Sequence, residues 1–373
     1  MNPPPAEIGA PIADIDTPAL VVDLDALDRN IAKMAEFARA AGVRVRPHAK
    51  THKSAAIALR QIASGAVGQC VQKVGEAEAL VRGGVKDILV SNQVVGTRKL
   101  RRLAALAKDA TIALCFDSAE QVDAASRVAQ DFGVELGALV EIEVGMERCG
   151  VMPGKAAAAL ARRVADAPNL KFRGLQAYHG RAQHMATHQQ RAQAIASAVD
   201  AVRETLDALR ADNLDCEIVA GAGTGTFAFE AESGVYNELQ VGSYVFMDTD
   251  YAKIGNKDGG LYTAFEHSLF VLASVISTPA EDRAIVDAGL KSYSAEKGPP
   301  WVHGLDDVEL TAVSDEHGKL KVGPKAKRLS LGDKVWLIPG HCDPTVNLHD
   351  WYVGVRNGRV EVLWPVSARG ASI

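Results

Sequence analysis

The stretch VRVRPHAKTHK, residues 43–53, joins a β-branched run to a polar segment that carries two lysines and two histidines. Its first residues favour a strand, and in a barrel the residues that follow a strand lie where the chemistry takes place. A lysine amine in a partly desolvated pocket has a lowered pKa and can attack an aldehyde to form an imine. The stretch offers Lys50 and Lys53 for this reaction without choosing between them. A solvated basic loop is the alternative, since most lysines are exposed.

The composition is that of an ordinary globular protein. The chain has 373 residues, 47% of them hydrophobic and 23% charged, which leaves room for two domains. A net charge of -5 provides no basic stripe for nucleic acid. The sequence has neither a membrane-spanning apolar run nor a secretory signal, so we expect a cytoplasmic protein without membrane association. Five scattered cysteines, an odd number, argue against a disulfide framework.

Between about residues 19 and 248, short β-rich runs alternate with longer alanine-rich segments of helical periodicity. After a leading strand at residues 19–24, eight such runs predict an α/β fold, a (β/α)8 barrel. An open doubly wound sheet competes with it, but that fold usually has fewer strands and a glycine-rich turn after the first one, which this chain lacks. The predicted barrel strands are residues 43–47, 68–72, 87–91, 111–116, 138–144, 172–177, 217–220 and 239–246.

Beyond about residue 253 the helical periodicity disappears and strand-like runs follow one another. The pair Asn357-Gly358 between two of them is a strong hairpin signal. We therefore expect residues 1–24 to join a C-terminal all-β domain, residues 25–252 to form the barrel and residues 253–373 to form the β domain. The expected strands of this domain are residues 269–276, 283–286, 308–313, 320–322, 334–338, 352–355 and 360–364.

Polar residues of functional types follow the predicted barrel strands with a regularity not expected of random loops. The carboxyl ends of barrel strands are where (β/α)8 enzymes hold their active sites. These strand ends are therefore the predicted site of the chemistry. In chain order they carry Lys50, Gln72, Lys73, Asn92, Asp117, Arg148, Tyr178, His179, the segment 221–226 and Tyr244.

The segment Gly-Ala-Gly-Thr-Gly-Thr, residues 221–226, follows the seventh predicted strand. Glycines let backbone amides approach a phosphate closely, and the hydroxyls add donors. A flexible loop has the same composition, but phosphate sites in such barrels commonly follow the seventh and eighth strands. A reactive lysine and a phosphate site in one barrel point to pyridoxal phosphate as the cofactor. Arg148 is then expected to hydrogen-bond the phenolic oxygen of the cofactor, with a surface arginine as the alternative.

Two further groups of residues can take part in the chemistry. His179 and His184 flank a short polar loop, and a histidine in a cofactor pocket can act as a base near neutral pH, although most such histidines are structural or solvated. In the segment PGHCDPTVN, residues 339–347, an extended backbone would turn His341 and Asp343 to one face. Such a pair can hold Mn²⁺, Mg²⁺ or Zn²⁺ with waters or substrate completing the set. A turn with an exposed His341 is the alternative.

Taken together, these motifs resemble the D-threonine aldolase family, a branch of the alanine-racemase-like, fold-type III pyridoxal phosphate enzymes. The likeness extends over nearly the whole chain. The resemblance implies an N-terminal barrel, a C-terminal β domain and a homodimer. It rests on Asp16-Thr17-Pro18 and on the segments 46–50, 72–73, 148–150, 176–180, 221–225, 242–248 and 341–345.

The resemblance also implies roles for individual residues. Lys50, rather than Lys53, would form the imine with the cofactor, and His341 and Asp343 would be the metal ligands. Related D-serine and D-3-hydroxyaspartate dehydratases have a His-x-Cys pattern, and this chain has Asp343 at the cysteine position, which favours an aldolase. The implied cofactor-binding set is Lys50, Gln72, Arg148 at the ring and Tyr178, with Gly223, Thr224, Gly225 and Tyr244 at the phosphate.

We therefore predict a lyase that cleaves D-threonine and related D-3-hydroxy-α-amino acids to glycine and an aldehyde. Pyridoxal phosphate and a divalent metal are the expected cofactors, Mn²⁺ before Mg²⁺, Co²⁺ or Zn²⁺. His184 is the first choice for the base that takes the 3-hydroxyl proton, and His52 the second. A D-3-hydroxyaspartate aldolase, for which Arg181 could serve the substrate carboxylate, a dehydratase of the same family and a non-enzymatic pyridoxal phosphate carrier are the alternatives.

Overall fold

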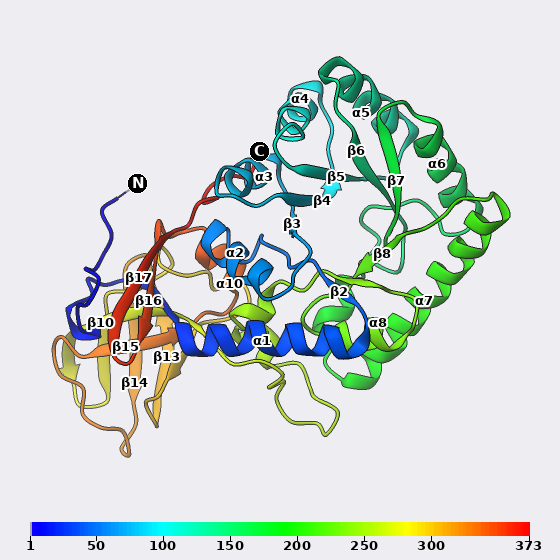
Figure 1. Ribbon diagram of the computed structural model, residues 1–373. Helices are drawn as coiled ribbons and strands as arrows, with labels where there is room; N and C mark the ends of the chain where they lie inside the picture. The colour runs from blue at the N-terminus through cyan, green and yellow to red at the C-terminus, as the bar shows by residue number, and fades with distance from the viewer. Residues whose placement is uncertain (1) are drawn as a thin grey trace.

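The computed structural model describes residues 2–373 and confirms the predicted (β/α)8 barrel with a β domain beside it (Figure 1). Eight parallel strands form the barrel wall in the order β2-β9-β8-β7-β6-β5-β4-β3. Their bounds are β2 (Arg44–Val45), β3 (Gln69–Val71), β4 (Asp87–Gln93), β5 (Thr111–Phe116), β6 (Leu136–Glu141), β7 (Leu170–Gln176), β8 (Ile218–Gly221) and β9 (Glu238–Leu239).

The first and last strands of this order, β2 and β3, meet through one isolated bridge between His48 and Cys70. Backbone hydrogen bonds of 2.8 Å from Ala49 N to Cys70 O and from Cys70 N to Pro47 O flank the bridge. We call this closure the β2–β3 seam. Because β2 and β3 are short, few backbone hydrogen bonds close the barrel wall here. Side chains therefore have to contribute to the stability of this closure.

Helices follow the strands and cover the outside of the barrel. Side-chain caps fix several starts: Asp23 accepts from the amides of Asp25 and Ala26, and Ser118 caps its helix by accepting from Gln121 N at 3.4 Å. The bounds are α1 (Leu24–Ala41), α2 (Ala55–Ala63), α3 (Val74–Arg82), α4 (Thr97–Leu106), α5 (Ala119–Phe132), α6 (Lys155–Asp166), η2 (Arg181–His184), α7 (His188–Ala211), α8 (Phe227–Glu232), η3 (Ser243–Val245) and α9 (Thr249–Ala252). Among residues 2–373, no helix combines the length and the apolar character needed to cross a membrane.

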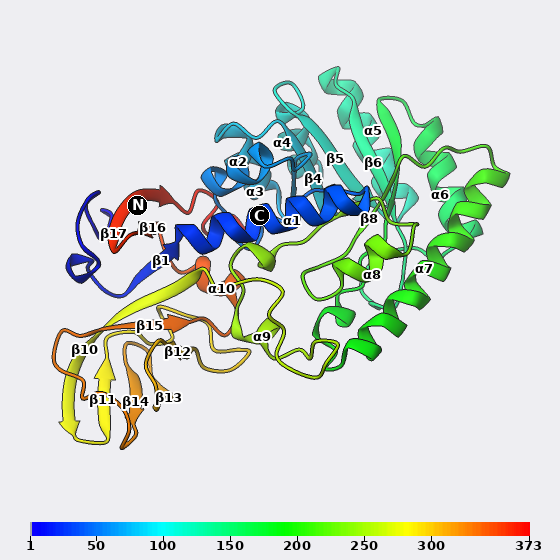
Figure 2. The ribbon, with the colours of Figure 1, turned by 60° about the horizontal axis from the view of Figure 1, so that its bottom comes forward.

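The β domain is built on a second sheet in which β1 (Ala19–Asp23) takes part. β1 pairs antiparallel with β10 (Leu269–Ala280) and parallel with β16 (Trp351–Arg356). α1 then runs from this sheet along the barrel, as both views show (Figures 1 and 2). The remaining strands are β11 (Arg283–Val286), β12 (Trp301–His303), β13 (Val308–Val313), β14 (Gly318–Val322), β15 (Lys334–Ile338) and β17 (Arg359–Pro365), and a short η1 (Ile12–Asp14) precedes β1.

Local signals explain where the sequence predicted the β strands well and where it did not. The hairpin at Asn357-Gly358 is confirmed, because both residues have the positive φ angles, 51° and 73°, that a two-residue turn requires. The eighth barrel strand was predicted to reach residue 246 but ends at Leu239, and η3 follows it. That segment is apolar because it is buried between α1 and the β domain, not because it is extended. β12 was missed.

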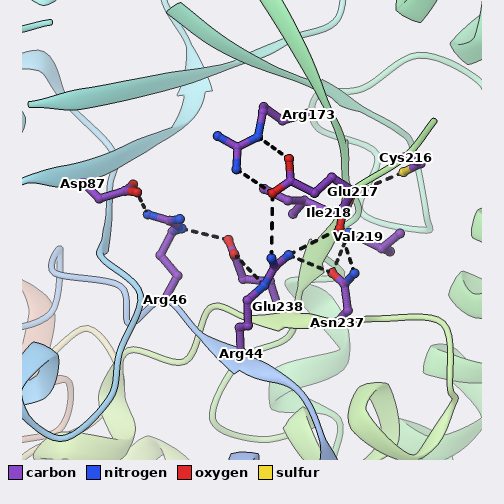
Figure 3. A network of polar contacts seen from close by, with 10 residues as sticks. All are labelled: Arg44, Arg46, Asp87, Arg173, Cys216, Glu217, Ile218, Val219, Asn237 and Glu238. Carbon is purple, nitrogen blue, oxygen red and sulfur yellow. Dashed lines mark hydrogen bonds and ion pairs between the residues drawn. The ribbon is translucent and has the colours of Figure 1, made fainter. Parts of the chain in front are cut away.

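The barrel interior is layered. An apolar middle layer comes from alternate positions of the strands: Cys70, Leu89, Ala113, Cys115, Leu139, Ile218 and Ala220. Near the amino ends of the strands lies a charged layer, which we call the floor network (Figure 3). It consists of Arg44, Arg46, Asp87, Arg173, Glu217 and Glu238.

Arg46 is the centre of the floor network. Its Nε lies 2.8 Å from Glu238 Oε1 and its Nη1 lies 2.5 Å from Asp87 Oδ1 (Figure 3). The Arg46 and Glu238 side chains are 7% and 1% exposed. Gly68 is required beside this pair, because a Cβ there would lie 2.4 Å from Arg46 Nη1. The network links β2 and β9 to β4 across the β2–β3 seam.

We expect Glu238→Gln to destabilise the fold, because it leaves the buried Arg46 with one carboxylate fewer. Breaking a buried pair costs about 3 kcal/mol, measurable as a fall in the free energy of unfolding in urea. A variant as stable as the parent chain would show that the floor network contributes little to closing the barrel.

Candidate active site

A cavity of about 320 Å³ opens at the carboxyl ends of the barrel strands. Seven of the predicted site residues line it: Lys50, Gln72, Arg148, Tyr178, His184, Gly223 and Thr224. Other lining residues were not assigned a role from the sequence: His48, Ser91, Met146, Gln176, Gly180, Gln240, Gly242, Ser243 and Tyr251. Arg181 also lines the cavity, whereas His52, Gly225, Tyr244, His341 and Asp343 lie outside this lining.

Lys50 is held in the turn that follows β2, and its Nζ forms an ion pair with Asp343 Oδ2. The lysine side chain is 37% exposed and the aspartate side chain 16%. Burial opposes the charge of Lys50, but the attraction of Asp343 outweighs it and raises the lysine pKa. The same pairing lowers the pKa of Asp343 in spite of its burial. The lowered lysine pKa expected from desolvation alone was therefore wrong for this arrangement, since the partner carboxylate comes from the β domain.

His48 connects Lys50 to the other side of the β2–β3 seam. Its Nδ1 accepts from Lys50 N at 3.3 Å, and its Nε2 lies 3.0 Å from Gln72 Nε2 and 3.1 Å from Ser91 Oγ. Burial, reinforced by the charge of Lys50, lowers the pKa of His48 well below its ordinary value, so the ring is neutral. The sequence carried one signal for this residue, its place two positions before Lys50.

The glycine-rich segment 221–226 forms one wall of the cavity. Thr224 Oγ1 is buried there without a hydrogen-bond partner among residues 2–373. A Cβ on Gly223 would lie 2.5 Å from Gln183 Oε1, and one on Gly242 would lie 2.8 Å from Thr51 Oγ1, so neither position has room for a side chain. An unpartnered hydroxyl and two glycines that line the cavity with bare backbone are the features expected of a phosphate cradle.

The predicted phosphate residues Gly225 and Tyr244 point elsewhere. Gly225 N donates to Gln183 Oε1 at 3.0 Å, so its amide is engaged within the protein. The Tyr244 hydroxyl accepts from Gln61 Nε2 at 3.0 Å, and its ring packs edge-on against Phe265. Tyr244 borders a second cavity beneath α1, and the neighbouring Gly242 and Ser243 line the first one in its place.

A buried chain of hydrogen bonds supports the glycine-rich segment from behind. Gln183 Nε2 donates to Thr226 Oγ1 at 2.7 Å, and that hydroxyl donates to Glu230 Oε1 at 2.7 Å. Burial raises the pKa of Glu230 to about 7. The cradle therefore rests on a carboxyl that is largely protonated below neutral pH.

The structure separates the two histidines predicted as the base. His184 lines the cavity, its Nδ1 lies 2.9 Å from Asp250 Oδ2, and its ring packs against Tyr251. Burial raises the pKa of Asp250, but its contact with His184 and the charges of His184, Lys297 and His341 together outweigh burial and lower the pKa. His52 is fully buried, its Nδ1 accepts from Ser54 N at 3.1 Å, and burial lowers its pKa to about 4. His184 is thus the histidine that can reach a ligand.

Arg148 and Tyr178 face each other at the mouth of the cavity. The guanidinium carbon of Arg148 lies 5.9 Å from the Tyr178 ring centre, and Nη2 lies 3.9 Å from Glu141 Oε1. Arg181 lies nearby, with its Nη1 2.8 Å from Glu147 Oε2. His179, the other histidine that flanks the polar loop, is buried with its Nδ1 unpartnered within residues 2–373.

His341 and Asp343 stand at the start of α10 (Cys342–Val346) rather than in the extended segment that we expected. His341 Nδ1 contacts a Glu296 carboxylate oxygen, and Asp343 Oδ1 is buried without a partner in the described chain. Within residues 2–373, no group of three or more His, Cys, Asp or Glu side chains is arranged to hold a metal ion. The pair therefore offers two ligands of suitable chemistry, a nitrogen and an oxygen, of an incomplete set.

Comparison with known proteins matches both parts of the chain. Residues 22–250 match the family model described as "Alanine racemase, N-terminal domain", and residues 268–355 match "Putative serine dehydratase domain". A 3-hydroxy-D-aspartate aldolase of Paracoccus denitrificans is 49% identical over 98% of this chain and 95% of its own. A D-threonine aldolase of an Arthrobacter species is 48% identical over 99% of this chain and 97% of its own.

A solved structure is similar over the same length. The D-threonine aldolase from Filomicrobium marinum superposes with a TM-score of 0.94, is 46% identical, and the match covers 99% of this chain and all of that one. The likeness extends through the barrel, the β domain and the join between them.

We expect the pKa of Glu230 to make the stability of the fold depend on pH. This carboxyl has an ordinary pKa of 4.5 and a raised one of about 7 in the fold, so the folded chain holds an extra proton between these values. Its contribution to stability is greatest below pH 4.5 and is lost as the pH rises through 7. Glu230→Gln should remove this slope, which amounts to roughly 3 kcal/mol at most.

The measurement is the free energy of unfolding of both chains at several pH values between 4.5 and 8. Glu232→Gln, at an exposed position of the same helix, is the control and should leave the slope in place. Parallel curves for the parent chain and Glu230→Gln would contradict the raised pKa.

Proposed function

Because the chain belongs to the D-threonine aldolase family of alanine-racemase-like proteins, we propose that it is a pyridoxal phosphate-dependent carbon–carbon lyase. It cleaves D-3-hydroxy-α-amino acids, D-threonine and D-allo-threonine among them, to glycine and an aldehyde. The observation that carries this proposal is the convergence of Lys50, Arg148, Thr224 and His184 on one cavity.

The lining of the cavity suits pyridoxal phosphate. Lys50 supplies the amine that an aldehyde needs, and Arg148 supplies a cation for the phenolic oxygen. The unpartnered Thr224 hydroxyl and the bare backbone of Gly223 and Gly242 in the lining suit the phosphate, since an anion requires donors and room to approach. This fit is better than that of a solvated basic loop, the other interpretation of the same residues.

The chemistry needs an electron sink and a way to remove the proton of the 3-hydroxyl. Bound pyridoxal phosphate would supply the sink for the electron pair of the Cα–Cβ bond, and His341 and Asp343 would hold a divalent cation, Mn²⁺ in the first instance, that would lower the pKa of the 3-hydroxyl. His184 turns Nδ1 to Asp250, so Nε2 is the nitrogen left to accept that proton. Asp250 stabilises the charge that His184 then carries.

Arg181 and its partner Glu147, at the mouth of the cavity, affect which substrate side chain can bind. Arg181 lines the cavity and pairs with Glu147. Its guanidinium is a cation within reach of a second carboxylate on the substrate. D-3-hydroxyaspartate is therefore the alternative substrate. A comparison of kcat/KM for D-threonine and D-3-hydroxyaspartate decides between them, and Arg181→Gln should lower only the value for the dicarboxylic substrate if this arginine binds it.

A dehydratase is the second candidate reaction, with loss of the α-proton and of the hydroxyl and release of an oxo acid. Asp343 argues against it, because the related dehydratases carry a cysteine at this position of the pattern. Product analysis distinguishes the two reactions: an aldolase releases glycine and an aldehyde, and a dehydratase releases an oxo acid and ammonia.

We further propose that the chain forms a homodimer and acts in the cytoplasm. The resemblance to a dimeric family supports the first proposal, and the five free cysteines, which suit a reducing compartment, support the second. Sedimentation of the purified chain measures its mass in solution.

We expect Lys50→Ala to abolish both cofactor attachment and aldehyde release, because it removes the amine that holds the cofactor. Activity should fall by several orders of magnitude. Borohydride reduction of the parent chain with pyridoxal phosphate, followed by peptide mass analysis, should label Lys50 and leave Lys53 unlabelled. Aldehyde release at the parent rate by Lys50→Ala would rule out this assignment.

We expect removal of divalent metal by a chelator to stop glycine formation, and added Mn²⁺ to restore it. His341→Ala should have the same effect as the chelator, since one of two protein ligands is lost. His303→Ala, at an exposed histidine of β12, is the control and should leave activity unchanged. Glycine formation that survives complete metal removal would exclude the proposed role of His341 and Asp343.

A further inference from the structure

Lys53, the second lysine of the stretch 43–53, is buried in an ion pair outside the cavity lining. Its Nζ lies 2.5 Å from Glu76 Oε1, and the two side chains are 10% and 4% exposed. Lys53 follows Lys50 by three residues, and Glu76 is in the first turn of α3 after β3. The pair therefore joins the two sides of the β2–β3 seam at the end of the barrel where the cavity opens.

Glu76 also fixes the backbone at the end of β3. Its Oε2 accepts from Gln72 N at 2.8 Å and from Lys73 N at 3.1 Å. Gln72 is a lining residue of the cavity and lies 3.0 Å from His48. The Glu76 carboxylate therefore accepts from three donors. Two of these, the amides of Gln72 and Lys73, fix the backbone that positions Gln72 in the cavity.

Lys53 holds the backbone of the turn that presents Lys50. It has a positive φ of 48°, unusual for a residue with a side chain, and its N donates to Ala49 O at 2.7 Å. Its carbonyl accepts from Ala368 N at 2.9 Å. The turn 49–53 is thus closed on itself, and the side chain of Lys53 ties it to α3.

The C-terminal end of the chain packs against the start of α3, next to Glu76. Gly75 N donates to Ile373 O at 2.8 Å, and a Cβ on Gly75 would lie 3.1 Å from Ala371 Cβ. Figure 1 shows the C-terminus beside α3. The ion pair is therefore covered by protein, which accounts for its low exposure.

A buried ion pair is a poor source of stability, because the loss of water around both charges offsets most of their attraction. What the pair does provide is a fixed distance between two segments. The seam beside it has one bridge in place of a strand ladder, so the ion pair adds to the few contacts, those of His48 among them, that set Lys50 relative to Gln72.

We propose that Lys53 and Glu76 are positioning residues, whose ion pair across the β2–β3 seam holds Lys50 and Gln72 in the arrangement that binds the cofactor. The inference rests on the proposed function, since it takes Lys50 as the lysine that attaches pyridoxal phosphate. It assigns the second lysine of the stretch a role that excludes it from the chemistry.

The test uses the double variant Lys53→Met/Glu76→Gln. It removes both charges together, so no unpaired charge is left buried, and the new amide oxygen can still accept from Gln72 N and Lys73 N. The dissociation constant of pyridoxal phosphate, measured by absorbance titration, is the main readout. We expect it to rise tenfold to a hundredfold, the range seen when a group that orients a ligand-binding residue is lost.

Glu238→Gln is the matched control, because it breaks a buried ion pair between Arg46, just after β2, and the neighbouring β9 at the opposite end of the barrel. It should lower the stability of the fold and change the dissociation constant of the cofactor by less than twofold. Lys53→Arg, which keeps the charge, should bind the cofactor more tightly than the double variant.

The outcomes separate this inference from the proposed function. If the parent chain binds pyridoxal phosphate at Lys50 and the double variant binds it equally well, the positioning role is wrong and the proposed function stands. If the double variant and Glu238→Gln weaken binding to the same extent, the effect is one of general stability and the inference is also wrong. If the parent chain fails to attach the cofactor at Lys50, the proposed function is wrong, and the inference with it.

Discussion

The closure of the barrel between β2 and β3 is the constraint on which the rest of the structure depends. A strand ladder fixes the distance and the register of two segments through a row of backbone bonds, and here one bridge takes its place. Charged side chains help to fix the distance between the two segments that the backbone bonds leave less constrained. The floor network around Arg46 ties the seam at the amino ends of the strands, and the pair of Lys53 with Glu76 ties it at the carboxyl ends. The cavity opens beside this second tie, so residues that close the fold also hold the neighbouring Lys50 and Gln72 that line the site.

The second unit of the fold is needed because the barrel alone leaves Lys50 without its partner. Asp343 reaches it from α10 of the β domain, and β1 fixes that domain to the start of α1 through pairing with β10 and β16. The barrel supplies the amine, and the β domain supplies the carboxylate that controls its charge. This arrangement explains how residues nearly three hundred positions apart in the sequence act in one site.

The sequence predicted the strand ends better than the strands. Lys50, Arg148, His184 and Thr224 were found because a β-rich run followed by a polar residue is a local pattern, and parallel strands bring their ends together. Tyr244 was misplaced for the opposite reason: its segment is apolar because it is buried between two units, and local pattern does not distinguish such a segment from a strand. His48 and the pair Lys53–Glu76 depend on contacts across the seam, which no spacing in the sequence records. Asp343 was singled out with His341 as a possible metal-ligand pair, but its contact with Lys50 follows only from the docking of the β domain.

The difference between the two lysines of one stretch lies in how firmly each partner carboxylate is held. Glu76 accepts from Lys53 and from two backbone amides, so both of its oxygens are engaged. Any movement of this carboxylate would break hydrogen bonds. Asp343 bonds Lys50 through one oxygen, and its other oxygen is buried without a partner within residues 2–373. A carboxylate with an unused oxygen can turn to another cation, whereas one with three donors cannot leave them without cost. Lys53 therefore stays in its ion pair as a structural residue, and Lys50 is the lysine that can leave its partner to react.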